Sequence, residues 1–320
     1  MMFIDSKIQF SFFQISQVKA LSLALLMLLI SPVFAGEKIN RSLDTAETAK
    51  IKICNDRGSI SINVWDKNEV LVKGEIDDLA DKFVFEKKDD FILIEVELTA
   101  KHAHGKNNGK GSKFEVWLPK KHDMQFNGIA TDILLNGLAG DVNINSVSGN
   151  VNAKSVEGNL RIKNISGKVL LNDISGRIDV STVSGKLEAN VKSSNIKVKA
   201  ISSDIIVVTD QIDNISLFSI SGNTKLSGEL SVNGKIKLEN VSGDSYFFYN
   251  DIFDARISMN TGPDGSIINR IRPFERKKSH LNSQQQHYVE GEASAKVTML
   301  TVSGKVGLKN ISEINKRKKR

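Results

Sequence analysis

The chain has 320 residues, of which 40% are hydrophobic and 25% are charged, a length that suits one elongated domain or two compact ones. The formal net charge is +7, and Cys54 is the only cysteine, so a disulfide within one copy of the chain is excluded. Stability must therefore come from a packed core and backbone hydrogen bonds. We expect Cys54 to be a buried strand residue rather than a reactive thiol.

Residues 1–35 have the pattern of a signal peptide. Lys7 and Lys19 precede the apolar run ALSLALLMLLI, and the small residues of VFA at 33–35 suit cleavage. The run from Ala20 to Ile30 is too short to span a membrane comfortably, because a spanning helix needs about 20 apolar residues. We therefore expect cleavage after Ala35 and export, with a periplasmic location favoured over the cell surface or secretion. A retained membrane anchor is the competing interpretation.

Residues 36–128 are predicted to form an N-terminal β cap. The segment KIKICNDRGSISINVWD alternates around Asp56-Arg57-Gly58, which has the composition of a turn. NEVLVKGEI, DKFVFEKKDDFILIEVEL and SKFEVWLPK continue as short strands separated by polar turns. An antiparallel region here would protect the edge of the sheet that follows it.

His102 and His104 form a His-X-His pair followed by GKNNGKGSK. A metal site would need further His, Asp, Glu or Cys ligands nearby, and lysines surround this pair instead. Glycine and asparagine are typical of a flexible hairpin loop. We therefore predict a loop here and no metal site.

Residues 129–209 consist of nine segments of nine residues in unbroken phase. Each reads apolar, small, Gly, any, apolar, any, apolar, any, any, and this short fixed period indicates a repeat architecture. Of 27 positions predicted to face inward, 26 are apolar, and Lys192 is the exception. The first apolar position is occupied in turn by Ile129, Leu138, Val147, Val156, Ile165, Ile174, Val183, Lys192 and Ile201.

The repeat predicts a β-solenoid in which each unit is one short strand and one corner. The two later apolar positions are two residues apart, as expected for a strand with one buried face. The glycine of each triplet is expected at the corner, where positive φ costs it little. Two units per coil are favoured over three, and the periodicity leaves both open. The serines before the corners are interpreted as a hydrogen-bonded ladder rather than as nucleophiles: Ser148, Ser166, Ser175, Ser184, Ser193 and Ser202.

The repeat loosens after Thr209 but its triplet returns. ISGNTKL at 220–226 and VSGDSYF at 241–247 extend the solenoid to residue 261, and VSGKVGL at 302–308 places final solenoid strands at 295–311. Residues 262–294 are polar and basic and are predicted to be an excursion. The tail at 312–320 is basic. It could contact anionic lipid or polysaccharide, or it could simply be solvated.

The sequence predicts no catalytic, cofactor-binding or metal-binding residues. The positions after the corners include Lys168, Arg177 and Lys186 in a row, which would repel a column of calcium ions. Between Asn127 and Leu217 there is no His, Cys, Phe, Tyr or Trp, which removes the usual bases and thiols. The outward carboxylates Asp179 and Glu188, one unit apart, leave open a β-helix carbohydrate-active enzyme as an alternative.

The ordered motifs GSISINVWD, FEVWLPK, the repeated VSG and ISG triplets and VSGKVGL resemble the bacterial putative-adhesin domain of unknown function, which is related to the head-GIN family. The resemblance covers roughly residues 40–310. It implies an exported β-solenoid at the cell envelope, and it carries no catalytic residues that could be transferred.

These observations predict an exported, non-enzymatic, adhesin-like binding module associated with the envelope. Its partner is expected to be a protein, a polysaccharide or an anionic lipid surface, and no nucleic acid is expected. An envelope-stress accessory or regulatory protein is an alternative function. The candidate binding surface is an outward column formed by Asn143, Asn152, Arg161, Leu170, Asp179, Glu188 and Lys197.

Overall fold

The computed structural model describes residues 36–45, 49–98, 109–250, 253–272 and 283–311. The chain divides into two units, Met1–Phe34 and Ala35–Arg320, and all described strands belong to the second. The predicted signal peptide, the loop with His102 and His104, and the tail at 312–320 lie outside the described residues. Every secondary-structure element of the described residues is a β-strand, so the predicted all-β class is confirmed.

The strands in chain order are β1 (Lys38–Asp44), β2 (Lys50–Trp65), β3 (Glu69–Glu75), β4 (Ala80–Lys88), β5 (Phe91–Leu98), β6 (Ser112–Pro119), β7 (Met124–Asn136), β8 (Val142–Ser148), β9 (Val151–Lys154), β10 (Leu160–Asn164), β11 (Lys168–Asn172), β12 (Ile178–Val191), β13 (Asn195–Ser221), β14 (Thr224–Ser242), β15 (Ser245–Tyr249), β16 (Ala255–Asn269), β17 (Gln285–Glu290) and β18 (Ala295–Asn310).

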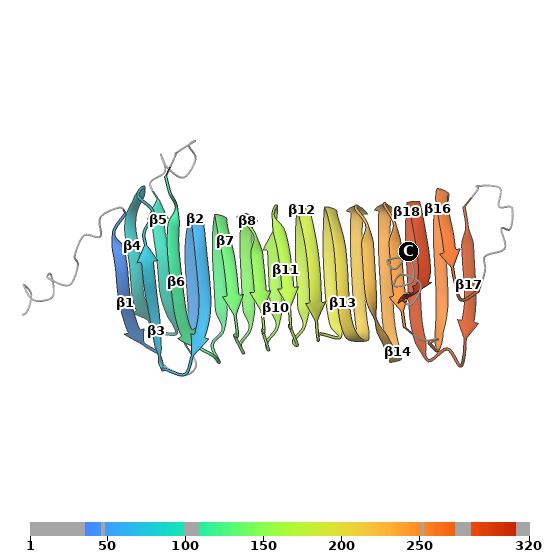
Figure 1. Ribbon diagram of the computed structural model, residues 1–320, viewed down its shortest axis with the longest axis horizontal. Helices are drawn as coiled ribbons and strands as arrows, with labels where there is room; N and C mark the ends of the chain where they lie inside the picture. Colours follow the sequence, from blue (N-terminus) through green and yellow to red (C-terminus); the bar gives the residue numbers. More distant parts are fainter. Residues whose placement is uncertain (1–35, 46–48, 99–108, 251–252, 273–282, 312–320) are drawn as a thin grey trace, which may run out of the picture. The chain divides into compact units, whose positions relative to one another are not determined.

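Within the second unit, the repeat forms parallel coils stacked in a row (Figure 1). Leu160 lies beside Val142 on one side and Ile178 on the other, and hydrogen-bonded partners of neighbouring coils are 18 residues apart. One coil therefore holds two nonapeptides, which confirms the favoured arrangement and excludes three. We call the side that carries β8 and β10 the first face, and the side that carries β9 and β11 the second face.

The two later apolar positions of every unit from 129 to 209 are buried, as predicted. The first apolar position behaves differently in alternate units. Leu138, Val156 and Ile174 are fully buried, whereas Ile165 is 49% exposed. The prediction that the first position always faces inward is therefore wrong for the odd units, whose residues point outward: Ile129, Val147, Ile165, Val183 and Ile201. It is also wrong for Lys192, which is exposed and pairs with Asp173 at 2.6 Å.

The backbone before each triplet explains this alternation. Gly137, Ser155 and Asp173, which precede the buried residues Leu138, Val156 and Ile174, all have positive φ, between 54° and 84°. A residue in the left-handed region shifts the strand alternation, and the next side chain turns inward. At the other corner the preceding residue itself turns inward, as Asn164 does with an exposed fraction of 2%, so Ile165 faces solvent.

The corner glycines have two different reasons for being glycine. Gly149, Gly167 and Gly185, at the exposed corners, have φ between 110° and 121°, as predicted. Gly158 and Gly176, at the buried corners, lack positive φ, so the predicted reason is wrong for them. A Cβ at Gly158 would lie 2.1 Å from the carbonyl oxygen of Gly140 in the preceding coil. Close coil stacking, rather than backbone conformation, requires these glycines.

Replacing Gly167 by alanine is expected to destabilise the fold. Its φ of +118° costs a side-chain-bearing residue about 1–3 kcal/mol. The new Cβ would also lie 2.2 Å from the Gly149 carbonyl oxygen, which adds to that cost. The control is Ser166→Ala, which removes only a 3.4 Å bond from the Ser166 hydroxyl to the Val147 carbonyl, about 1 kcal/mol. Equal urea midpoints for the two variants would contradict the expectation.

Polar ladders hold the corners of successive coils together. The Ser148 hydroxyl donates to the Ile129 carbonyl oxygen at 3.1 Å, and Ser166 and Ser184 repeat the contact one coil further on each time. The serine ladder is therefore confirmed for these three residues. Asp and Asn after the corners accept backbone N–H groups in the same way, as Asp132 does from Asn150 at 2.7 Å. These Asp and Asn side chains therefore form a second ladder beside the serine ladder, which the sequence pattern did not predict.

The N-terminal strands form the predicted cap, with one difference in connectivity. β2 is a single strand of 16 residues that pairs in parallel with β7 on one side and with β5 and β6 on the other. Asp56-Arg57-Gly58 is therefore a coil corner, with Arg57 beside Ala130, and the predicted hairpin turn is wrong. The antiparallel part consists of β4 on β5, β3 on β6 and β1 on β3.

The C-terminal end repeats this arrangement. β18 pairs in parallel with β14 and β15 on one side and with β16 on the other, and β17 pairs antiparallel with β16. Residues 262–269, which the sequence places in an excursion, continue β16 after a register shift between Thr261 and Asp264. Each end of the stack thus places a strand from near one chain terminus inside the stack, and antiparallel strands beyond it (Figure 1).

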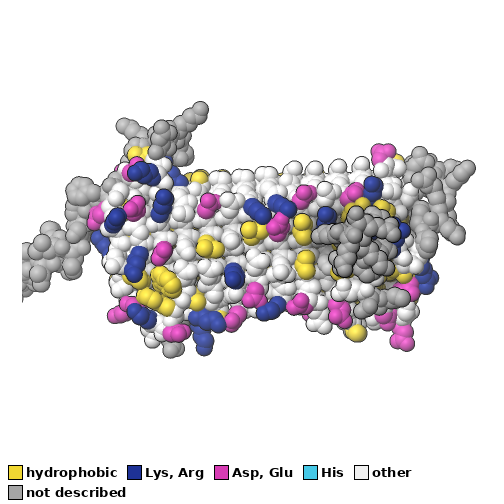
Figure 2. Space-filling model, in the orientation of Figure 1, with side chains coloured by type: hydrophobic (Ala, Val, Ile, Leu, Met, Phe, Trp, Pro, Cys, Tyr) yellow, Lys and Arg dark blue, Asp and Glu magenta, His cyan; other side chains and the backbone are white. Residues whose placement is uncertain are grey.

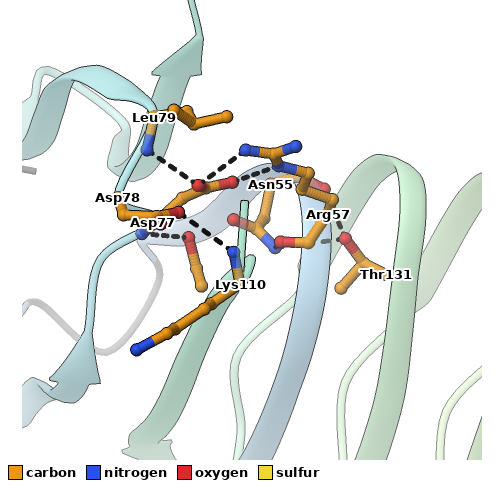
Figure 3. A network of polar contacts seen from close by, with 8 residues as sticks. Asn55, Arg57, Asp77, Asp78, Leu79, Lys110 and Thr131 are labelled. Carbon is orange, nitrogen blue, oxygen red and sulfur yellow. Dashed lines mark hydrogen bonds and ion pairs between the residues drawn. The ribbon is translucent and has the colours of Figure 1, made fainter. Parts of the chain in front are cut away.

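A buried ion pair fixes the N-terminal corner to the segment between β3 and β4 (Figure 3). Arg57 Nη2 donates to Asp77 Oδ1 at 2.8 Å, Arg57 Nε donates to Asp77 Oδ2, and the Leu79 N–H donates to Asp77 Oδ1 at 2.9 Å. The Asp77 side chain is 1% exposed. Burial alone would raise the pKa of Asp77, but the hydrogen bonds from Arg57 and Leu79 outweigh it, and the pKa is lowered.

Candidate functional site

The predicted outward column is divided between the two faces of the stack. Asn143, Arg161, Asp179 and Lys197 lie in register on the first face. The remaining members, Asn152, Leu170 and Glu188, lie in register on the second face. A single column is wrong because successive nonapeptides of an 18-residue coil occupy opposite faces. Asp179 and Glu188 are separated for the same reason, and they cannot act as a catalytic pair.

A polar groove of about 840 Å³ runs across the first face near the beginnings of its strands. Arg161 and Asp179 line it from the coils, and Lys50 and Lys52 line it from β2. Two of its carboxylates already have backbone partners. Asp123 accepts the N–H of Asp141 at 2.9 Å, and Asp141 accepts the N–H of Asn159 at 2.9 Å. The groove therefore offers hydrogen-bonding groups of both charges in a row at coil spacing.

A second groove of about 630 Å³ lies on the same face, where the strands end at the exposed corners. Four of the outward aliphatic residues line it, together with Phe218, and its charged lining residues are Lys163 and Lys199. No carboxylate lines this groove. Its lining combines apolar side chains, uncharged Asn, Ser and Thr side chains and two lysines, in contrast to the mixed charges of the polar groove. The four aliphatic residues are Val147, Ile165, Val183 and Ile201.

The outward aliphatic residues continue beyond this groove in an uninterrupted series, which we call the aliphatic stripe. The register places Ile220 after Ile201, and then Val241 and Val302, each in the same place of its coil triplet. All eight residues are between 40% and 50% exposed. The stripe consists of Ile129, Val147, Ile165, Val183, Ile201, Ile220, Val241 and Val302.

Charged and hydrophobic side chains are intermixed on the surface shown in Figure 2. On the second face a groove of about 610 Å³ is lined by Lys73, Lys113 and Glu115 among others. The strands beside it carry Trp65 and Trp117, with ring centroids 5.9 Å apart. The Trp65 indole N–H donates to the Glu69 carbonyl at 2.8 Å, and Lys67 lies over the Trp65 ring. Both contacts give this aromatic pair a structural role at the cap.

The described residues contain no group of three or more His, Cys, Asp or Glu side chains that could hold a metal ion. Cys54 is half-buried rather than buried as predicted, because it lies on the outward side of β2. Burial raises the pKa of its thiol, and the neighbouring Glu95 raises it further, so the protonated form is favoured. None of the described segments is a helix long and apolar enough to cross a membrane.

The geometry defines a two-faced β-solenoid with grooves on its outer surfaces. The sequence profile of the Toastrack DUF4097 family matches residues 48–309, and the chain belongs to this family. The nonapeptide pattern did not show that the first residue of the triplet is buried at one corner of each coil and exposed at the other. The pattern also did not show that β2 and β18, strands from near the two chain termini, lie inside the stack with other strands beyond them.

Three solved structures are similar to this chain. A putative adhesin from Bacteroides fragilis has 14% identity and a TM-score of 0.43, with 86% of this chain and 97% of that chain covered. A putative adhesin from Parabacteroides merdae has 11% identity, coverage of 86% and 98%, and a TM-score of 0.34. A putative cell adhesion protein from Clostridium sporogenes has 11% identity, coverage of 86% and 99%, and a TM-score of 0.26. No curated protein matches the chain.

Proposed function

We propose that this chain is an exported, non-enzymatic binding module of the cell envelope, and that the first face is its binding surface. The observation that carries the proposal is the repetition of outward side chains in register on this face. Arg161, Asp179 and Lys197 occupy the same position in successive coils. Such a surface can contact an extended or planar partner at many equivalent points, which is how repeat folds use their long surfaces.

Two further observations support a binding role over an enzymatic one. The groove carboxylates Asp123 and Asp141 accept backbone N–H groups, so part of their hydrogen-bonding capacity is used by the fold. Glu188 on the second face is paired with Lys186 and, at 3.3 Å, with Lys168. Hydrogen bonds from these lysines lower the pKa of Glu188, which disfavours it as a general acid. Export is supported by the sequence of residues 1–35.

The test is retention of envelope components by immobilised chain. The chain from Ala35 onward is used, because it forms a compact unit by itself. We expect it to retain a defined component from envelopes of the cells that produce it. The double variant Arg161→Glu, Lys197→Glu on the first face should reduce retention at least tenfold.

The matched control is Lys154→Glu, Lys225→Glu, which reverses two exposed charges on the second face. It should leave retention within about twofold, because exposed charges away from the binding surface contribute little. No retained component, or equal loss in both variants, would contradict the proposal. So would recovery of the native chain only from the cytoplasm.

A further inference from the structure

The aliphatic stripe is an exposed feature that the fold does not require. At the other corner the same triplet buries its first residue completely, as Ile174 shows, so the coil can hold an aliphatic side chain inside. At the stripe, the corner hydrogen bonds come from the serine hydroxyl and the backbone, and the side chains of Val147 and Ile165 are not needed for them. A contiguous row of exposed aliphatic residues on a folded chain marks an interaction surface.

The stripe residues are also in register from coil to coil along the stack. Backbone hydrogen bonds join the triplets of adjacent coils, such as Ser184 N–H to the Ile165 carbonyl at 2.8 Å. Eight rungs separated by about 4.8 Å extend over roughly 34 Å. A partner must itself be flat or extended over that length to contact every rung at once. A compact ligand would contact only a few of them.

The charges beside the stripe are mainly positive. Lys163 and Lys199 line the groove itself, and neither makes an ion pair among the described residues. The two outward columns on the first-face side of the stripe hold five basic residues and two acidic ones, Asp179 and Glu239, and Glu239 pairs with Lys237. The basic residues are Arg161, Lys163, Lys197, Lys199 and Lys237, in register with one another by coil. The column on the other side of the stripe is balanced, with three lysines and three carboxylates: Lys168, Lys186, Lys305, Asp132, Asp204 and Asp244.

We propose that this edge of the first face binds the surface of an anionic phospholipid bilayer. The aliphatic stripe enters the interface between headgroups and acyl chains, and the neighbouring Lys and Arg side chains contact lipid phosphates. This inference rests on the proposed envelope location and names the partner of that face. A second copy of the chain fits less well, because it would bring two columns of net positive charge together.

The experiment is flotation of the chain from Ala35 onward with vesicles, so that the apolar run at 20–30 cannot act as an anchor. Vesicles of phosphatidylcholine with one third phosphatidylglycerol should carry the chain, and pure phosphatidylcholine should carry at least tenfold less. Salt at about 0.5 M should weaken binding, since it screens the lysine contribution.

Two pairs of variants separate the contribution of the aliphatic stripe from that of the neighbouring lysines. The quadruple variant Val147→Ser, Ile165→Ser, Val183→Ser, Ile201→Ser should lose at least tenfold in partitioning. Its control replaces outward apolar residues of the second face and should stay within twofold: Leu134→Ser, Leu170→Ser, Ile206→Ser and Val208→Ser. Lys163→Gln with Lys199→Gln should lose roughly 10- to 30-fold on anionic vesicles only, and Lys154→Gln with Lys225→Gln on the second face should lose much less.

Partitioning that is equal for the stripe variant and its control would overturn the proposal. So would a change from dimer to monomer in the stripe variant, measured by light scattering, with vesicle binding unchanged, because a second copy would then be the partner. If native envelopes retain the chain but pure lipid vesicles do not, the lipid inference fails and the proposed function stands. If vesicles bind while the native chain is found only in the cytoplasm, the proposed function fails.

Discussion

Replacing Ile174 by aspartate should unfold the stack or leave it strongly destabilised, whereas the same change at Ile165 should leave stability nearly unaltered. The two residues occupy identical Ile-Ser-Gly triplets in consecutive units. Ile174 is completely buried and Ile165 is 49% exposed. A carboxylate at 174 would lose about 2–5 kcal/mol of aliphatic packing and add the cost of an unpaired buried charge, several kcal/mol more.

Urea unfolding followed by circular dichroism checks this expectation, with Ile165→Asp as the matched control. An exposed substitution of this kind usually changes stability by no more than about 0.5 kcal/mol. If Ile174→Asp does not express as folded protein, the milder pair Ile174→Ala and Ile165→Ala gives the same ordering. Similar losses at both positions would show that the two corners are equivalent and that the described alternation is incorrect.

The nonapeptide pattern was sufficient to predict the strands, the core and the class of fold. All 18 later apolar positions are buried because strand alternation depends on spacing alone, which the sequence displays directly. The exposure of the triplets could not be predicted in this way. It depends on whether the preceding residue takes positive φ, as Asp173 does, or turns inward, as Asn164 does. Asn and Asp are both tolerant of either conformation.

The ends of the stack were less predictable for a different reason. β2 lies between β7 and the pair β5 and β6, although 58 residues separate the end of β2 at Trp65 from the start of β7 at Met124. Short apolar strands of similar composition can pair in several orders. The order is decided by tertiary packing rather than by local pattern. The aliphatic stripe, the feature on which the lipid inference rests, becomes visible only once coil length and corner exposure are both known.

Replacing Asp77 by asparagine should cost the fold about 3–5 kcal/mol at neutral pH. Removing one partner of a buried ion pair is strongly destabilising, and the guanidinium of Arg57 would lose its bidentate carboxylate partner. The loss should be largest at the N-terminal end, because Arg57 belongs to the corner of β2 and Asp77 to the segment after β3. The control is Glu239→Gln, which breaks a partly exposed 3.0 Å pair with Lys237 worth no more than about 1 kcal/mol.

The same pair determines part of the stability at acidic pH. Because the folded chain lowers the pKa of Asp77, its contribution is fully present above the unfolded value of about 3.9 and is lost as pH falls through the folded value. Unfolding measured from pH 7 to pH 2 should therefore show a steeper acid loss in the native chain than in Asp77→Asn, which cannot titrate at this position. The two curves should converge at low pH, where the native Asp77 is protonated and neither chain has a carboxylate at position 77 to pair with Arg57. Parallel curves would show that another carboxyl group is responsible for the acid dependence and that the Arg57 contact is not stabilising.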